Sequence, residues 1–546
     1  VERSVVDQSL LAADAAAPFG VRTDPERIRR AVGEALDDPC SMIVVDGGDL
    51  IRREEAVVRG DPSVALREPL LALDELVGSV RSRLDPARDL LLLVSPTSPA
   101  TDALPHLGVA IAEGPGFGAG DALTSGSTGA SGIVALTDVA PTVLLHQGVA
   151  RPESMVGRAW FRENGGDDPV ESAVELDLEA RFAHRWQPIV SGAFGVADLL
   201  LVIGAFWFFR RRRRPEDRPT SGRLLEWAAL AALSFPFVAF ASTPLPADDL
   251  GPALYGAALV VLTVLVAGAV TRSGRSVLER TLIVCVATIL LLAVDLLAGA
   301  RLQLTGIWGN DAILGGRFAG LGNIGFAVLG SCSIAAAALL VHLRKDSWGV
   351  PAASVVLTLA VLIDGMPFLG RDVGGVLALV PALLLTGVLL FGRKVTFRSV
   401  VLAILIAGAL LTAFAAIDLA RPEDQQTHLA RLVDDIKQEG TGAFTDALDR
   451  KLDANIGVFG ESPASFLIPP IWALFAWLVL RGKGRWQILR ARHPELHAAL
   501  VGGLSLALFG GVVNDSGVVV VAVVMSVLAP VAVVMLLDGE RHGEAT

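Results

Sequence analysis

The sequence predicts an α/β domain with a parallel sheet, followed by an all-α polytopic transmembrane domain of about eleven helices. Two observations lead to this fold class. From residue 188 onward, long apolar runs alternate with short charged loops, whereas residues 1–187 read as a soluble acidic domain. Charged residues make up 19% of the whole chain, against about 25% in an average soluble protein. The composition therefore indicates one soluble domain, 1–187, and one membrane domain, 188–546.

The predicted elements of the first domain alternate between helices and strands. Thr23–Glu26 is a capping box with a proline in the first turn, which predicts a helix over 24–37. The apolar run 41–46 ends in an aspartate, as a buried parallel strand would. The other predicted elements are a helix over 64–84, strands over 90–95, 107–112 and 132–136, and a helix from Thr137 or Asp138 to His146. Such alternation is typical of a parallel sheet.

A candidate ectodomain site follows from that sheet, because ligands in such folds bind beyond the carboxyl ends of the strands. The residues at those ends are Asp46, Asp49, Ser95, Thr97 and Asp138. Asp46 and Asp49 are the only candidates here for metal ligands, although Asp-Gly-Gly-Asp is more often a turn held by local hydrogen bonds. No CxxC motif or Cys/His cluster along the sequence indicates a zinc site.

The second domain contains eleven apolar runs that approach the length of about 20 residues needed to cross a bilayer. The predicted spans are 189–209, 225–242, 252–271, 280–299, 321–343, 350–365, 373–392, 399–417, 464–480, 497–513 and 517–537. The lipid bilayer is therefore the first partner that the sequence predicts.

The distribution of Lys and Arg predicts the orientation in the cell membrane. Basic residues gather in alternate loops, from the run Arg210–Arg214 to the loop 481–492. This pattern places residues 1–187 and the loop 419–463 outside, and the C-terminus in the cytoplasm. The first residues, VERSVVDQ, are not a signal peptide, so we expect a signal or anchor helix upstream of Val1; the alternative is an unusual insertion with the N-terminus outside.

Three polar motifs that contain glycine lie at predicted outer ends of spans: Gly316–Asn323, Gly370–Gly375 and Asn514–Gly517. Polar groups at membrane depth are costly and usually face a protein interior or a water-filled cavity. We expect a shared outward-facing pocket, where Arg317 and Arg371 suit a phosphate or carboxylate. Helix caps and structural ion pairs are the alternative. The candidate pocket residues are Asp295, Arg317, Asn323, Asp364, Arg371, Asp372, Asn514 and Asp515.

One segment of the first domain carries a family resemblance. TDVAPTVL at Thr137–Leu144, followed by MVGR at Met155–Arg158, resembles the closing segment of the alkaline phosphatase superfamily, which includes sulfatases. The resemblance covers about residues 40–160. It implies one or two divalent metals, such as Zn, Mn or Mg, held by Asp and His beside a Ser or Thr nucleophile.

This sequence departs from that pattern. Pro96-Thr97 stands where the family has an Asp-His metal pair, and no nucleophile segment is visible. The resemblance therefore implies an incomplete or degenerate domain, a pseudoenzyme that binds rather than cleaves. The three polar motifs of the second domain also resemble segments of bacterial membrane proteins that join a phosphatase-like ectodomain to a multi-span domain.

The predicted function is recognition or processing of a phosphorylated or lipid-linked cell-envelope glycan at the outer membrane face. The net charge of −11 argues against nucleic acid as a partner, because that needs a basic patch. Three alternatives stay open: a non-catalytic membrane scaffold, a transporter or lipid carrier, and an active metal-dependent phosphatase or sulfatase. A transporter predicts polar residues at mid-span, whereas these polar motifs lie at the outer ends.

Overall fold

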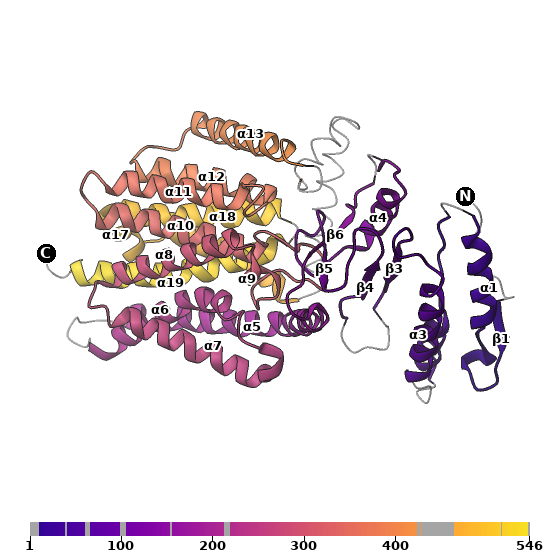
Figure 1. Cartoon of the computed structure of the whole chain (residues 1–546). Coiled ribbons are helices and arrows are strands. Elements are labelled where there is room, and N and C mark those ends of the chain that lie inside the picture. The colour runs from indigo at the N-terminus through magenta and orange to yellow at the C-terminus, as the bar shows by residue number, and fades with distance from the viewer. Residues whose placement is uncertain are drawn as a thin grey trace. The chain divides into compact units, whose positions relative to one another are not determined.

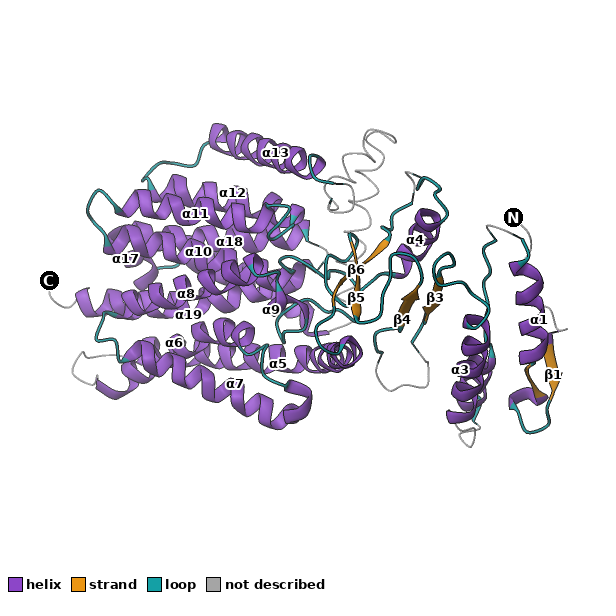
Figure 2. Cartoon of the chain, viewed as in Figure 1, coloured by secondary structure: helices purple, strands orange, loops and turns teal. Residues whose placement is uncertain are grey.

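The computed structural model describes most of the chain in nine segments. They are residues 10–38, 41–60, 66–98, 105–152, 155–211, 219–422, 426, 463–514 and 516–543. The chain forms two compact units, Val1–Asp177 and Leu178–Thr546, and the boundary falls within helix α5 (Pro169–Arg211). Figures 1 and 2 show strands only in the first of these units. Most of the predicted outer loop, 419–463, lies outside the described residues.

The first unit consists of short strands and helices. In chain order they are β1 (Leu11–Ala13), η2 (Pro18–Gly20), β2 (Val21–Thr23), α1 (Pro25–Leu36), α2 (Asp49–Val58), α3 (Arg67–Arg81), β3 (Leu91–Val94), β4 (Ala110–Glu113), β5 (Asp121–Ser125), η3 (Leu136–Asp138), α4 (Val139–His146) and β6 (Trp160–Asn164). The strands pair as β1–β2, β3–β4 and β5–β6, each pair antiparallel and in a sheet of its own.

The predicted α/β fold with a parallel sheet is therefore wrong. The run 41–46 forms no strand, and Met42 and Val44 are 63% and 79% exposed. Residues 132–136 form no strand either, and β5 lies earlier in the sequence than expected. A parallel pair needs a long crossover, usually a helix. No helix is described between β3 and β4, and their register from Leu91↔Glu113 to Val94↔Ala110 is that of a hairpin.

The helix predicted over 24–37 is confirmed by α1. Its N-cap is Asp24, whose carboxylate accepts hydrogen bonds from the backbone N–H groups of Glu26 and Arg27. Pro25 fits at the first helical position because its missing N–H would have no partner there. Ile28 and Val32 pack against Leu76 of α3 to form a small core. Local capping signals therefore predict the helices of this unit better than the apolar runs predict its strands.

All the regular secondary structure described in the second unit is helical. After α5 come α6 (Pro219–Ala241), α7 (Ala247–Thr271), α8 (Val277–Leu297), α9 (Arg301–Leu304), α10 (Asn323–Leu343), α11 (Gly349–Gly365), α12 (Val373–Leu390), α13 (Phe397–Leu419), η6 (Pro463–Leu467), α16 (Ile468–Arg481), α17 (Arg485–Arg492), α18 (Pro494–Val513) and α19 (Gly517–Gly543). Each of the eleven predicted spans coincides with one of these helices.

Nine described helices are long and apolar enough to cross a membrane: α5, α6, α7, α8, α10, α12, α13, α18 and α19. The helix α11 is shorter, and α16 with α17 forms a pair bent by 54° that would count as a tenth span. The protein is therefore a multi-pass membrane protein. The prediction of about eleven spans is larger because it counted α11 and α16 separately.

The helix α10 lies in the middle of this unit, and α13 lies at its edge (Figure 1). In the most apolar stretch of α10, 83% of the residues are buried, against 22% in α13. The run Ala335–Ala338 is fully buried, and Gly330 lets side chains of α12 and α18 approach the backbone. Small residues of this kind allow membrane helices to pack closely. The central helix thus fixes the positions of the ends of its neighbours.

Candidate functional site

A cluster of polar residues lies at one end of the helical unit, where α8, α11, α13 and α18 end and α10 and α12 begin. Hydrogen bonds connect its parts. The N–H of Leu321, before α10, donates to the carbonyl of Gly370, 2.9 Å away, in the loop before α12. The guanidinium of Arg421, after α13, donates to the carbonyl of Pro367 in the same loop, 3.1 Å away. Segments distant in the sequence are therefore joined around the loop 366–372.

This loop folds back tightly onto the end of α11. The N–H of Gly370 donates to the carbonyl of Ile363 at 2.9 Å, and that of Asp372 to the carbonyl of Asp364 at 3.1 Å. Arg371 lies between them with a φ of 55°, in the left-handed region that a residue with a side chain rarely adopts. The tight turn thus places Asp364, Arg371 and Asp372 next to one another.

Two buried carboxyl groups meet here. Asp364 is fully buried and Asp372 is 2% exposed. Asp372 Oδ1 caps α12 by accepting from the N–H of Gly375 at 3.0 Å, and it also accepts from Arg317 Nη2 at 3.3 Å. Both oxygens of Asp364 and the Oδ2 of Asp372 have no hydrogen-bond partner in the part of the chain that the structure describes.

Gly375 explains how the two groups come so close. A Cβ on this residue would lie 2.6 Å from Asp364 Oδ2 and 2.7 Å from Asp372 Oδ2. Only a glycine leaves room for both oxygens on the same side of the helix. A buried carboxylate without a partner is costly, so a proton or a cation is expected between these groups.

Three arginines, Arg317, Arg371 and Arg421, lie in the same cluster as the acid pair formed by Asp364 and Asp372. Two of these arginines bind to other residues of the protein. Arg317 donates to Asp372 and to the carbonyl of Leu321, and Arg421 pairs with Asp418 at 3.4 Å. The guanidinium of the half-buried Arg371 donates no hydrogen bond to any described residue. Burial lowers the pKa of Arg371, the like charge of Arg421 lowers it further, and Asp418 opposes the shift. A bound anion would relieve the cost of burying this charge.

Asp295 belongs to a neighbouring structural network. Its carboxylate accepts from the N–H of Leu302 at 2.8 Å and from Gln303 Nε2 at 3.2 Å, and so holds the short helix α9 against the end of α8. Asn310, which follows in the same loop, donates to the carbonyl of Gly320 at 3.5 Å. Asp295 therefore supports the loop that carries Arg317, and its described hydrogen bonds do not reach Asp364 or Asp372.

The other predicted membrane residues lie further from the acid pair. Asn323 is half-buried at the first position of α10, and Asn514 is buried at the end of α18, where its Nδ2 donates to the carbonyl of Gly510 at 3.1 Å. Asp515 lies outside the described residues. Of the predicted set, the structure thus brings Arg317, Asp364, Arg371 and Asp372 together.

The predicted ectodomain residues do not form a common cluster. Asp46 is exposed and accepts from the N–H of Gly48, as in a local turn. Asp49 accepts from the N–H of Thr23 at 3.0 Å and pairs with Arg52 at 2.6 Å. Ser95 and Thr97 are exposed and make a hydrogen bond with each other. No described hydrogen bond links any of these residues to Asp138.

Asp138 has a structural role that accounts for the motif around it. Its fully buried carboxylate accepts from Ser125 Oγ and Ser127 Oγ, both at 2.6 Å, and from the N–H groups of Ala135 and Arg158 at 3.0 and 2.9 Å. Gly157 packs so closely on Thr137 that a Cβ there would collide with its carbonyl. The segments TDVAPT and MVGR are therefore held together by a satisfied carboxylate.

Comparison of the chain with protein-family models, with curated proteins and with solved structures finds no match. The resemblance to the alkaline phosphatase superfamily thus gains no support beyond the residues quoted for it.

Other polar residues lie in or near this cluster and were not among the residues predicted from the sequence. Three of them are Gln303, Asp418 and Arg421. All three lie next to span ends on the same predicted side of the membrane, and this position could have indicated that they belong to the cluster. Asp198, which interrupts the apolar part of α5, was not predicted either. Asp198 is 7% exposed, and its Oδ1 has no hydrogen-bond partner among the described residues.

Proposed function

We propose that the membrane unit recognises an anionic cell-envelope compound, a phosphorylated or lipid-linked glycan, through Arg371 at the polar cluster. The observation that supports this is the guanidinium of Arg371, which is partly buried and donates to no described residue. A guanidinium offers five donors in a planar fork that matches a phosphate or carboxylate. The outward orientation of the cluster is part of the proposal and comes from the Lys/Arg distribution.

The backbone of Arg371 supports a ligand-binding role. A left-handed conformation at a residue with a side chain costs about 1–3 kcal/mol and persists where the surrounding structure imposes it, often at ligand clamps. Here the hydrogen bonds of Gly370 and Asp372 to the end of α11 impose it. Arg317 and Arg421 are held by Asp372 and Asp418, so Arg371 is the arginine of the cluster that can turn toward a ligand.

Asp364 gives the site a group that can exchange a proton. A phosphate that arrives at Arg371 adds negative charge close to two buried carboxyl groups, and a proton held by Asp364 would limit the repulsion. The same carboxyl group would serve as acid or base if the ligand is processed rather than only bound. Recognition and processing share the same residues and differ in whether a bond is broken.

The first unit enters this proposal as a binding module. The carboxylates considered for a metal, Asp46 and Asp49, hold a local turn and the contact of α2 with Thr23. The carboxylate of Asp138 already accepts hydrogen bonds from other groups of the protein. We therefore assign no hydrolytic step and no divalent metal to these residues.

Binding of a polyprenyl phosphate and of the corresponding polyprenol to the full chain in nanodiscs tests the proposal. Native mass spectrometry of the two ligands gives their relative affinity. We expect Arg371→Asn to lose preference for the phosphate by about tenfold to hundredfold, which is the range for a charge-assisted hydrogen bond of about 1.5–3 kcal/mol. Asparagine tolerates the left-handed backbone, so this variant removes the charge without adding strain.

Arg301→Asn is the matched control, because Arg301 lies on α9 near the same end of the unit and is exposed. This variant should keep the wild-type preference. Equal binding of the phosphate and the alcohol to the wild type would contradict the proposal.

A second function, transport coupled to a proton or a cation, is favoured by a different observation. Asp364, Asp372 and the mid-span Asp198 each have a buried carboxylate oxygen without a described partner. Ionisable groups of this kind mark proton and ion pathways in membrane proteins. Proteoliposomes with a pH gradient distinguish the two functions. A transporter would release the gradient, and Asp364→Asn would stop the release, whereas a recognition protein would leave the gradient intact.

A further inference from the structure

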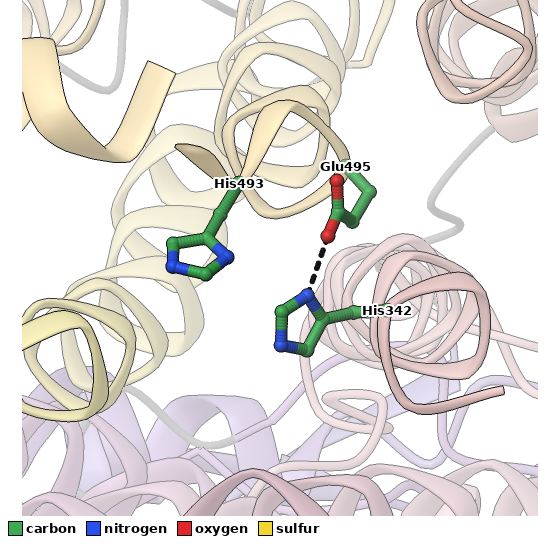
Figure 3. A group of neighbouring side chains, drawn as sticks. All are labelled: His342, His493 and Glu495. Carbon is green, nitrogen blue, oxygen red and sulfur yellow. Dashed lines mark hydrogen bonds and ion pairs between the residues drawn. The ribbon is translucent and has the colours of Figure 1, made fainter. Parts of the chain in front are cut away.

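A second cluster of chemically active side chains lies at the opposite ends of the same helices. His342 is near the end of α10, His493 immediately precedes α18, and Glu495 is in the first turn of α18. Figure 3 shows the three side chains pointing toward one another from two helices. His342 Nδ1 lies 2.5 Å from Glu495 Oε1, and the centroids of the two imidazole rings are 5.1 Å apart. All three residues are half-buried.

The start of α18 explains this arrangement. Pro494 at the first helical position fixes where the helix begins. A residue before proline is pushed out of the helical conformation, and His493 has a φ of −133° and a ψ of 63°. His493 and Glu495 are thus on either side of the helix start, and the packing of α10 on α18 brings His342 between them.

We propose that His342, His493 and Glu495 bind a divalent transition-metal ion, with Zn²⁺ as the best-suited ion. Two imidazoles and a carboxylate are a ligand set that zinc uses in proteins, with a fourth position for water or a further ligand. One ligand atom from each of the three residues lies within 4.8 Å of the others. In a tetrahedral zinc site such atoms are about 3.3–3.6 Å apart, from bond lengths of about 2.0–2.2 Å. Side-chain rotations close that difference.

A simple His–Glu ion pair explains less of the geometry. An ion pair accounts for the contact of His342 with Glu495. It does not account for the second imidazole, that of His493, which has a ligand atom within 4.8 Å of those of His342 and Glu495. A metal would use all three groups and would replace the His342–Glu495 hydrogen bond. It would also fasten the start of α18 to the end of α10, at the end of the unit away from Arg371.

Zinc titration of the full chain, purified in detergent without a histidine tag and stripped of metal, tests this proposal. We expect one equivalent of zinc to remain after desalting. We also expect Co²⁺ in place of zinc to give the visible absorption of a tetrahedral cobalt site. His342→Asn, His493→Asn and Glu495→Gln should each weaken zinc binding at least about tenfold, since loss of even an outer-shell partner costs about 10–100-fold.

His497→Gln is the matched control, because His497 lies on the same helix and directs its Nε2 to the carbonyl of Val479, 3.1 Å away. This variant should bind zinc as the wild type does. The wild-type measurement decides even where a variant fails to fold. Absence of a stoichiometric zinc ion from the wild type, or equal binding by the Glu495→Gln, His342→Asn and His493→Asn variants, would overturn the proposal.

Discussion

Arg317 and Asp372 are 55 positions apart in the sequence, and their side chains form an ion pair with 3.3 Å between Nη2 and Oδ1. Asp372 is almost fully buried, and Arg317 is 31% exposed. The pair connects the loop before α10 to the cap of α12. It is a direct side-chain link between two of the three polar motifs in the sequence.

We predict that Arg317→Met destabilises the protein by on the order of 3 kcal/mol, because it leaves a buried charge on Asp372 without its partner. The double variant Arg317→Met/Asp372→Asn should recover most of the loss, since asparagine still caps α12 but carries no charge. Thermal unfolding of the detergent-purified chain gives the order of the melting temperatures. An unchanged melting temperature for Arg317→Met would show that the ion pair contributes nothing.

Gly375→Ala should displace the acid pair. The added methyl would lie within 2.7 Å of Asp364 Oδ2 and Asp372 Oδ2, and such overpacking costs about 1–3 kcal/mol. Gly387→Ala, on the same helix, is the matched control because no atom lies within 4 Å of its Cβ position. That substitution should be neutral or stabilising by about 0.5–1 kcal/mol, as in other helix interiors. Equal melting temperatures for the two variants would refute the close approach of the carboxyl groups.

Asp364→Asn should be tolerated and Asp138→Asn should destabilise the protein, although both aspartates are fully buried. Asp364 has no described hydrogen-bond partner for either oxygen, so a neutral amide should be tolerated at neutral pH. Asp138 accepts four hydrogen bonds, and an amide N–H₂ would face donors instead, at a cost of about 1–3 kcal/mol. Thermal unfolding measures both. A larger loss for Asp364→Asn would mean that its carboxylate has a structural partner.

Arg371→Gly should raise the melting temperature while it removes the guanidinium. Glycine adopts a φ of 55° without strain, and relief of a left-handed residue is worth about 1 kcal/mol. A strained backbone conformation is expected at positions where the side chain is needed for binding, and Arg371 is such a residue in a tight loop. A lower melting temperature would show that the side chain of Arg371 stabilises the loop instead.

The membrane helices could be predicted from the sequence because hydropathy and capping are local properties. Asp372, which the sequence places just before a span, is the N-cap of α12, and Ser276 with Glu279 forms the capping box of α8. The strands of the first unit were predicted only in part: the runs 90–95 and 107–112 coincide with β3 and β4, whereas 41–46 and 132–136 form no strand. A strand depends on a distant partner, and the apolar run at 41–46 has none in the described structure.

The polar cluster was partly visible in the sequence and partly hidden. Arg317, Arg371 and Asp372 stand in glycine-rich motifs at span ends, whereas Asp418 and Arg421 stand in no motif. The histidine cluster was hidden for a different reason. His342 is 153 positions from Glu495, so only the packing of α10 against α18 reveals that they share a site.

The most direct test of an anion site at Arg371 is the affinity of the full chain in nanodiscs for a polyprenyl phosphate, compared with the alcohol that lacks the phosphate. We expect the wild type and Arg301→Asn to prefer the phosphate, and Arg371→Asn to have lost the preference. Binding of the phosphate by Arg371→Asn as tightly as by the wild type would contradict the assignment of the anion site to Arg371.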